Sequence, residues 1–135
     1  MTNDLCARLQ DLNEAGIYQL SCPLTVLEAN VVLSGLTLFE VDLSVVYSKG
    51  EFLAALAQVL QAPDWFGHNW DALADVLGDL SWQPASGYVL LLCGGGENLG
   101  LGEVDHEIVT EIFNDTVNYW KLQGKPFWVF IADGV

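Results

Sequence analysis

The sequence predicts an α/β protein with a small parallel sheet of three to four strands and helices packed against it. Segments with strand-like and helix-like apolar patterns alternate along the chain, as they do in proteins built around a parallel sheet. Two runs, 88–93 and 127–131, are apolar without interruption, which is typical of strands covered on both faces. The length of 135 residues, 52% of them hydrophobic, suffices for one packed core. We therefore expect residues 1–135 to form a single domain.

The first part of the chain predicts two helices and two strands. Leucines at helical spacing indicate the first helix, and glycine or proline residues mark where the helices and the first strand end. The expected elements are a helix over 3–15, a strand over 17–20, a helix over 24–33 and a strand over 37–43.

The remainder of the chain predicts three more helices and two central strands. Ser48 and Glu51 form a capping box that begins a helix ending before Pro63. The apolar residues of the next helix repeat at helical spacing from Trp70 to Leu80. The last three expected elements are a strand over 88–93, a long helix over 104–123 and a strand over 126–132.

The charge of the chain is strongly negative, at −14. Between Lys49 and Lys121 there is no lysine or arginine, whereas acidic residues are frequent. Such a field repels nucleic acid and anionic lipid and attracts basic partners. The simpler alternative is that the charge only keeps the protein soluble.

The cysteines and histidines predict neither a metal site nor a cofactor. Three cysteines lie far apart without a paired spacing, and the two histidines, His68 and His106, complete no metal-ligand pattern. Reduced thiols fit a cytoplasmic protein best. No signal peptide is visible, and no apolar stretch approaches the length needed to span a membrane.

The segment 62–82 combines aromatic residues with an acidic helix. Asp71, Asp75 and Asp79 follow one another at intervals of four residues opposite the apolar stripe, with no cation among them. Like charges at this spacing destabilise a helix by about 0.2–0.5 kcal/mol per pair, so the pattern indicates a function. Trp65 and Trp82 are expected to flank this acidic face.

Two kinds of function remain open from these residues. In an enzyme or metal protein, His68 and the aspartates would form an acid–base cluster or a weak metal site, but such a site needs groups that converge from several elements. In a binding protein, exposed carboxylates would replace the phosphates of a nucleic acid, because arginine binds both groups through paired hydrogen bonds. The aromatic residues could then stack where a base would lie. The second reading explains more of the segment.

The run Trp65-Phe-Gly-His-Asn-Trp-Asp-Ala-Leu-Ala-Asp75 closely resembles the signature of the barstar family, inhibitors of barnase-type ribonucleases. The similarity extends from the strand at 39–43 to the strand at 127–131. It implies a barstar-like fold in which residues 1–35 are an N-terminal extension to the family core. It also implies a protein that has no catalytic residues, binds no cofactor and blocks the active site of a basic ribonuclease.

The resemblance also assigns roles to individual residues. Asp75 falls on the aspartate that enters the nuclease active site, Asp71 on the aspartate that meets basic residues at the rim, and Trp65 on the aromatic that packs over the catalytic histidine. Gly67 and Gly78 match or adjoin positions where the surfaces of the inhibitor and the nuclease approach closely. The expected partner-binding set is Trp65, Phe66, Gly67, Asn69, Trp70, Asp71, Ala74, Asp75, Gly78 and Asp79.

The chain departs from the family pattern at three places, one of which is that the aromatic residue expected just beyond the helix is displaced to Trp82. Ala74 stands where a large aromatic residue often precedes the key aspartate, and no clear equivalent exists for a later glutamate that contacts the nuclease. Tyr119 occupies the nearest position, with Asp115 one turn earlier. These differences leave open a second hypothesis, a divergent interaction module that binds a different basic protein.

Overall fold

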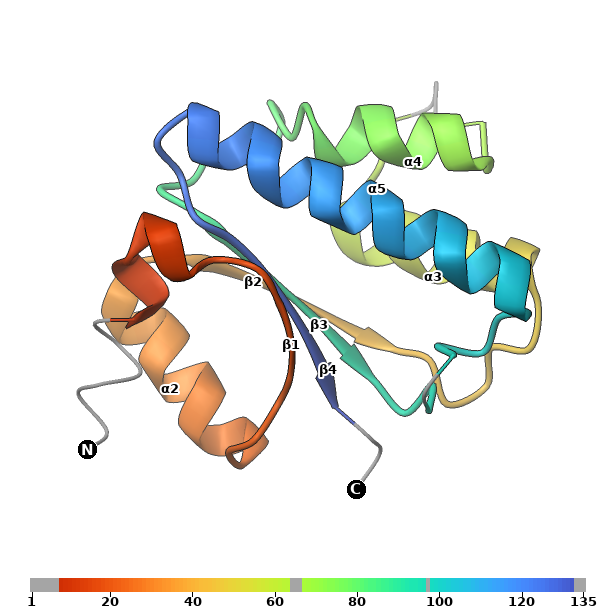
Figure 1. The fold of residues 1–135 in the computed structure, drawn as a ribbon, viewed down its shortest axis with the longest axis horizontal. Coiled ribbons are helices and arrows are strands. Elements are labelled where there is room, and N and C mark those ends of the chain that lie inside the picture. The colour runs from red at the N-terminus through yellow and green to blue at the C-terminus, as the bar shows by residue number, and fades with distance from the viewer. Residues whose placement is uncertain (1–7, 64–66, 97, 133–135) are drawn as a thin grey trace.

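The computed structural model describes residues 8–63, 67–96 and 98–132, and they form one four-stranded parallel sheet with helices on both faces (Figure 1). The predicted α/β fold is therefore confirmed. The strands are β1 (Ile17–Gln19), β2 (Thr37–Asp42), β3 (Tyr88–Cys93) and β4 (Phe127–Ala132), in the spatial order β1-β4-β3-β2. The helices are α2 (Leu24–Ser34), α3 (Lys49–Leu60), α4 (Trp70–Leu77) and α5 (Glu103–Leu122), preceded by the 3-10 turn η1 (Leu12–Glu14).

The helices form two layers of unequal size. Figure 1 shows α2 on one face of the sheet and α3, α4 and α5 together on the other face. The three helices of the larger layer all begin at the same end of the molecule (Figure 1). The acidic helix α4 packs against α5 and lies at the outer surface of this layer (Figure 1).

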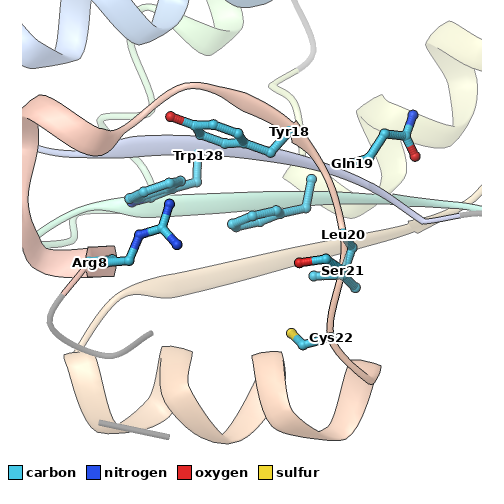
Figure 2. Close-up of a pocket in the computed structure, with 8 residues that line it drawn as sticks. Arg8, Tyr18, Gln19, Leu20, Ser21, Cys22 and Trp128 are labelled. Carbon is cyan, nitrogen blue, oxygen red and sulfur yellow. The ribbon is translucent and has the colours of Figure 1, made fainter. Parts of the chain in front are cut away.

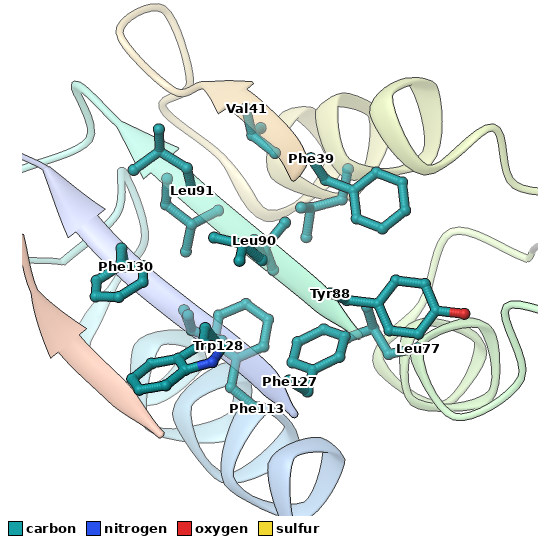
Figure 3. Close-up of a cluster of buried hydrophobic side chains, with 14 of the residues drawn as sticks. Phe39, Val41, Leu77, Tyr88, Leu90, Leu91, Phe113, Phe127, Trp128 and Phe130 are labelled. Carbon is teal, nitrogen blue, oxygen red and sulfur yellow. The ribbon is translucent and has the colours of Figure 1, made fainter. Parts of the chain in front are cut away.

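The core is centred on β3 and β4, as their uninterrupted apolar runs predict. Residues 88–92 and 127–130 are all buried, because helices or neighbouring strands cover both faces. The Tyr88 ring lies 5.9 Å from Phe127 and 6.0 Å from Phe39, and Figure 3 shows Phe113 and Leu77 reaching this cluster from the helical layer. The register is continuous, with Tyr88 beside Thr37 on one side and Phe127 on the other.

The N-terminal residues close the α2 side of the sheet. The Trp128 indole nitrogen, on β4, donates to the Leu9 carbonyl at 2.9 Å. The Trp128 and Phe130 rings stack at 5.5 Å, and Tyr18 of β1 lies 5.6 Å from Trp128. Figure 2 shows Arg8 beside the Trp128 ring at a small hollow of about 100 Å³. These contacts tie the N-terminal strand to the centre of the fold.

Most element predictions are confirmed within one or two residues, but the first helix is not continuous where the structure describes it. Residues 8–10 are helical, Asp11 is extended, and η1 follows. The reason is local: the Asp11 carboxylate accepts from the Asn13 backbone N–H at 3.0 Å, a turn that competes with helical hydrogen bonding. The predicted residues 3–7 of that helix lie outside the described part. Among the described helices, none has the length and apolar character to cross a bilayer.

Candidate protein-binding face

Helix α4 begins at a side-chain cap. Asn69 is extended, and its side-chain oxygen accepts from the Ala72 backbone N–H at 2.8 Å, which satisfies one of the free donors of the first turn. The Asn69 amide also donates to the Gly67 carbonyl at 3.4 Å. Asn69 therefore fixes the direction in which α4 leaves the preceding loop.

The two faces of α4 differ as the sequence predicts. Leu73, Val76 and Leu77 are fully buried. Asp71 and Asp75 are exposed on the opposite face, and neither carboxylate forms an ion pair or a hydrogen bond within the described part of the chain. Their carboxylates are therefore directed to solvent, where a partner can reach them.

The helix is shorter than the apolar spacing predicts, so Asp79 is not on it. The last helical residue is Leu77, and Gly78 follows as the cap. Leu80 then has φ +49°, a left-handed conformation that directs its side chain back into the core, where it is 1% exposed. The burial of Leu80 outweighs continuation of the helix through a glycine, which has low helix propensity. Asp79 is still exposed, next to the helix end.

Two indole hydrogen bonds hold α4 against α5, one near each end. The Trp70 nitrogen donates to the Asp105 carboxylate at 3.2 Å, and the Trp120 nitrogen donates to the Leu77 carbonyl at 2.8 Å. The Trp70 ring also lies 5.9 Å from Phe52 and 5.6 Å from the Lys49 ammonium group. Trp70 is one of the expected binding residues. Its contacts with Asp105, Phe52 and Lys49 hold the first turn of α4 in position.

The aromatic residues expected beside the acids have different outcomes. Trp65 and Phe66 lie outside the described residues. Trp82 is half-buried, and its indole donates to the Leu60 carbonyl at 2.9 Å, so that its place beside the acidic face stays a prediction. The indole N–H is hydrogen-bonded at the last residue of α3, because a half-buried indole N–H needs an acceptor. Gly67 is exposed at the start of the face.

A shallow groove of about 180 Å³ lies between α4 and α5, beside the acidic face. We call it the α4–α5 groove; its lining residues are Ala74, Gly78, Ile112, Asp115, Thr116 and Tyr119. Sequence reasoning identified Ala74 and Gly78 separately but did not predict a hollow. The small residues at an interval of four were the available signal, and only the position of α5 shows that no side chain of the described residues fills the space above them.

The described residues bring together no three His, Cys, Asp or Glu side chains in a geometry that could hold a metal ion. Acidic groups do gather around Cys93, at the carboxyl end of β3. Burial raises the pKa of the Cys93 thiol, and the negative charges of Glu40, Asp42 and Glu28 raise it further. This thiol is therefore held protonated, the opposite of a reactive cysteine.

Residues 36–132 match the family described as Barstar (barnase inhibitor). The chain belongs to the barstar family. The match begins just before β2 and ends with β4, so it includes the acidic helix α4, the α4–α5 groove and the three strands β2, β3 and β4. No match was found among the curated proteins compared with the chain. The family is one of protein inhibitors, which is the coarse function that the match supports.

Proposed function

We propose that this barstar-family protein inhibits a basic, barnase-like ribonuclease by covering its active site with α4 and the loop before it. The observation that carries the proposal is the outward direction of Asp71, Asp75 and Asp79 beside a helix held in place at both ends. Carboxylates so placed can meet the arginines and lysines that bind RNA phosphates. Protection of the producing cell, or neutralisation of a ribonuclease toxin in the cytoplasm, would follow.

Inhibition would have two separable parts. The net charge of −14 would accelerate the encounter with a basic nuclease, and added salt would slow it by screening. Insertion of Asp75 among cationic side chains would then slow dissociation, since charged hydrogen bonds removed from water are stronger than those at the surface. We assign the other contacts of the face to Gly67, Asn69, Ala74 and Gly78, and to Trp65 and Phe66 of the adjoining loop.

The test is a titration of the protein against a barnase-type ribonuclease in low and high salt, with RNA cleavage as the readout. The Asp75→Ala variant should inhibit at least about tenfold more weakly, the loss expected for a charged hydrogen bond. Glu107→Ala, which removes an exposed carboxylate from α5, is the matched control and should affect only the association rate. Equal inhibition by Asp75→Ala and the parent would exclude the mechanism.

A second candidate is an interaction module that binds a basic protein other than a nuclease. It is favoured by Ala74, where an aromatic residue often stands in the family, and by Tyr119, where a glutamate is expected. Residues 1–35, which we treat as an extension to the family core, supply β1 and α2 and could carry part of such a role. Co-purification of a non-nuclease partner, lost in Asp75→Ala, would favour this candidate.

A further inference from the structure

The α4–α5 groove has the size and lining of a site for one ring. Its volume of about 180 Å³ compares with engineered protein cavities of about 150 Å³ that bind benzene. Ala74, Ile112 and the ring of Tyr119 supply apolar surface. The hydroxyl of Thr116 donates to the Ile112 carbonyl at 2.8 Å, so its donor is already hydrogen-bonded and needs no acceptor from a ligand. An apolar group would therefore enter without leaving a polar group unpaired.

The walls of the groove are held apart by contacts of the fold. The Trp70–Asp105 and Trp120–Leu77 hydrogen bonds set the spacing of α4 and α5 on either side of it. The Tyr119 ring, 43% exposed, stands edge-on to Trp120 at 5.2 Å. A site whose walls are already fixed loses little conformational entropy on binding.

The charges around the groove indicate what kind of molecule carries the ring. Asp115 lines the groove, Asp75 is adjacent to Ala74 in sequence, and both carboxylates are exposed. No lysine or arginine lines the groove. A ring on an acidic surface would be repelled, whereas a ring flanked by arginine or lysine would bring matching charge to the rim.

We propose that the α4–α5 groove receives one aromatic side chain that projects from the basic partner protein. This inference rests on the proposed function, because it makes the groove part of the same interface. In this interface Ala74 and Gly78 determine specificity. Because both residues are small, they leave the α4–α5 groove open on the inhibitor, and the partner supplies the ring that fills it. A nuclease that has a flat or polar surface at this point would bind less tightly.

The first test uses p-cresol, the side chain of tyrosine as a free molecule, and needs no nuclease. Titration into isotope-labelled protein should shift the NMR signals of Ala74, Ile112, Thr116 and Tyr119 in a saturable way. Ala74→Trp, which fills the groove from the inhibitor side, should abolish these shifts. Ala29→Trp, at an exposed alanine of α2, should leave them unchanged. Absent shifts, or shifts that survive Ala74→Trp, would overturn the inference whatever the nuclease assay shows.

The second test uses the barnase-type ribonuclease that the parent protein inhibits most tightly and measures its inhibition by the same variants. Ala74→Trp should weaken inhibition at least about tenfold, as expected when a central anchor is excluded, and Ala29→Trp should not. If Asp75→Ala abolishes inhibition while Ala74→Trp inhibits as well as the parent, the proposed function stands and the groove inference fails. If the parent protein inhibits no such nuclease, the proposed function fails, and p-cresol binding alone decides whether the groove accepts a ring.

Discussion

Replacing Asp75 by asparagine should stabilise the free protein, although the same change should weaken inhibition. The Asp75 carboxylate is exposed and forms no hydrogen bond or ion pair within the described residues, so the substitution removes no native bond. It relieves repulsion with Asp71, four residues earlier, by about 0.2–0.5 kcal/mol. It also removes a negative charge from the last turn of α4, the negative end of the helix dipole, for about 0.3 kcal/mol more. The expected gain is about 0.5–0.8 kcal/mol.

Asp71→Asn is the matched comparison, because it removes the same repulsion from the other end of the helix. Asp71 lies in the first turn of α4, where a carboxylate is favoured by about 0.3–1 kcal/mol. The two terms therefore oppose each other, and the net change should lie between a gain of about 0.2 kcal/mol and a loss of about 0.8 kcal/mol. The Asp75→Asn variant should thus be more stable than the Asp71→Asn variant, although the chemical change is the same.

The assay is urea denaturation of the parent and the two variants in low and high salt. The midpoint should rise for Asp75→Asn at low salt, and the difference should shrink in high salt because salt screens both terms. A lower midpoint for Asp75→Asn would refute the reasoning. It would mean that Asp75 has a stabilising partner in the free protein and is not available to a nuclease.

Three further predictions concern the framework of the fold. Trp120→Phe should lower the free energy of unfolding by about 2–3 kcal/mol, because it leaves the Leu77 carbonyl without its indole donor and opens a cavity. Glu40→Gln should raise the melting temperature at pH 7 by on the order of 1 °C, a small gain for an exposed group. Burial raises the pKa of the Glu40 carboxyl in the folded protein, and so do a hydrogen bond with Glu28 and the negative charge of Glu28. The free energy of unfolding therefore falls as the pH rises through that pKa. Gly100→Ala should cost about 2–3 kcal/mol, since Gly100 has φ +77° and an added Cβ would collide with the backbone before α3.

Each of these predictions has a matched control. Tyr119→Phe keeps the ring beside Trp120 and should change stability by less than about 0.5 kcal/mol. The gain from Glu40→Gln should disappear below the ordinary carboxyl pKa of 4.5, and adding Glu28→Gln should yield little more, because either change removes the same repulsion. Gly102→Ala, at a glycine with open space around it, should be tolerated. A Gly102→Ala variant as unstable as Gly100→Ala would contradict the steric argument.

The sequence was sufficient to predict the type and order of nearly all the described elements. Capping residues are local signals, and the bond from the Glu51 backbone N–H to the Ser48 hydroxyl at 3.2 Å is where the pattern places it. The uninterrupted apolar run of β3 likewise predicts a strand covered on both faces, because such a run is stable only away from water. The opposition of aspartates and leucines on α4 follows from helical periodicity alone.

The errors arose where distant parts of the chain compete with a local pattern. Apolar spacing extends the helix to Leu80, but core packing takes Leu80 in a left-handed conformation and ends α4 at Leu77. The Trp82 indole likewise donates to a distant group, the carbonyl of Leu60, 22 residues earlier, and the local pattern does not predict this contact. Neither partner can be read from neighbouring residues.

By itself, the sequence determined the α/β class, the family and the acidic face, because these depend on the spacing of residues within segments and on the order of the segments along the chain. The tertiary structure alone decided that α4 is fixed to α5 by hydrogen bonds between residues 35 and 43 positions apart. It also decided that the described side chains leave a space open between these helices beside Ala74. A groove forms where the side chains of two helices do not contact each other. Which side chains make contact is determined by the packing of α4 against α5, and the residue pattern of neither helix predicts it.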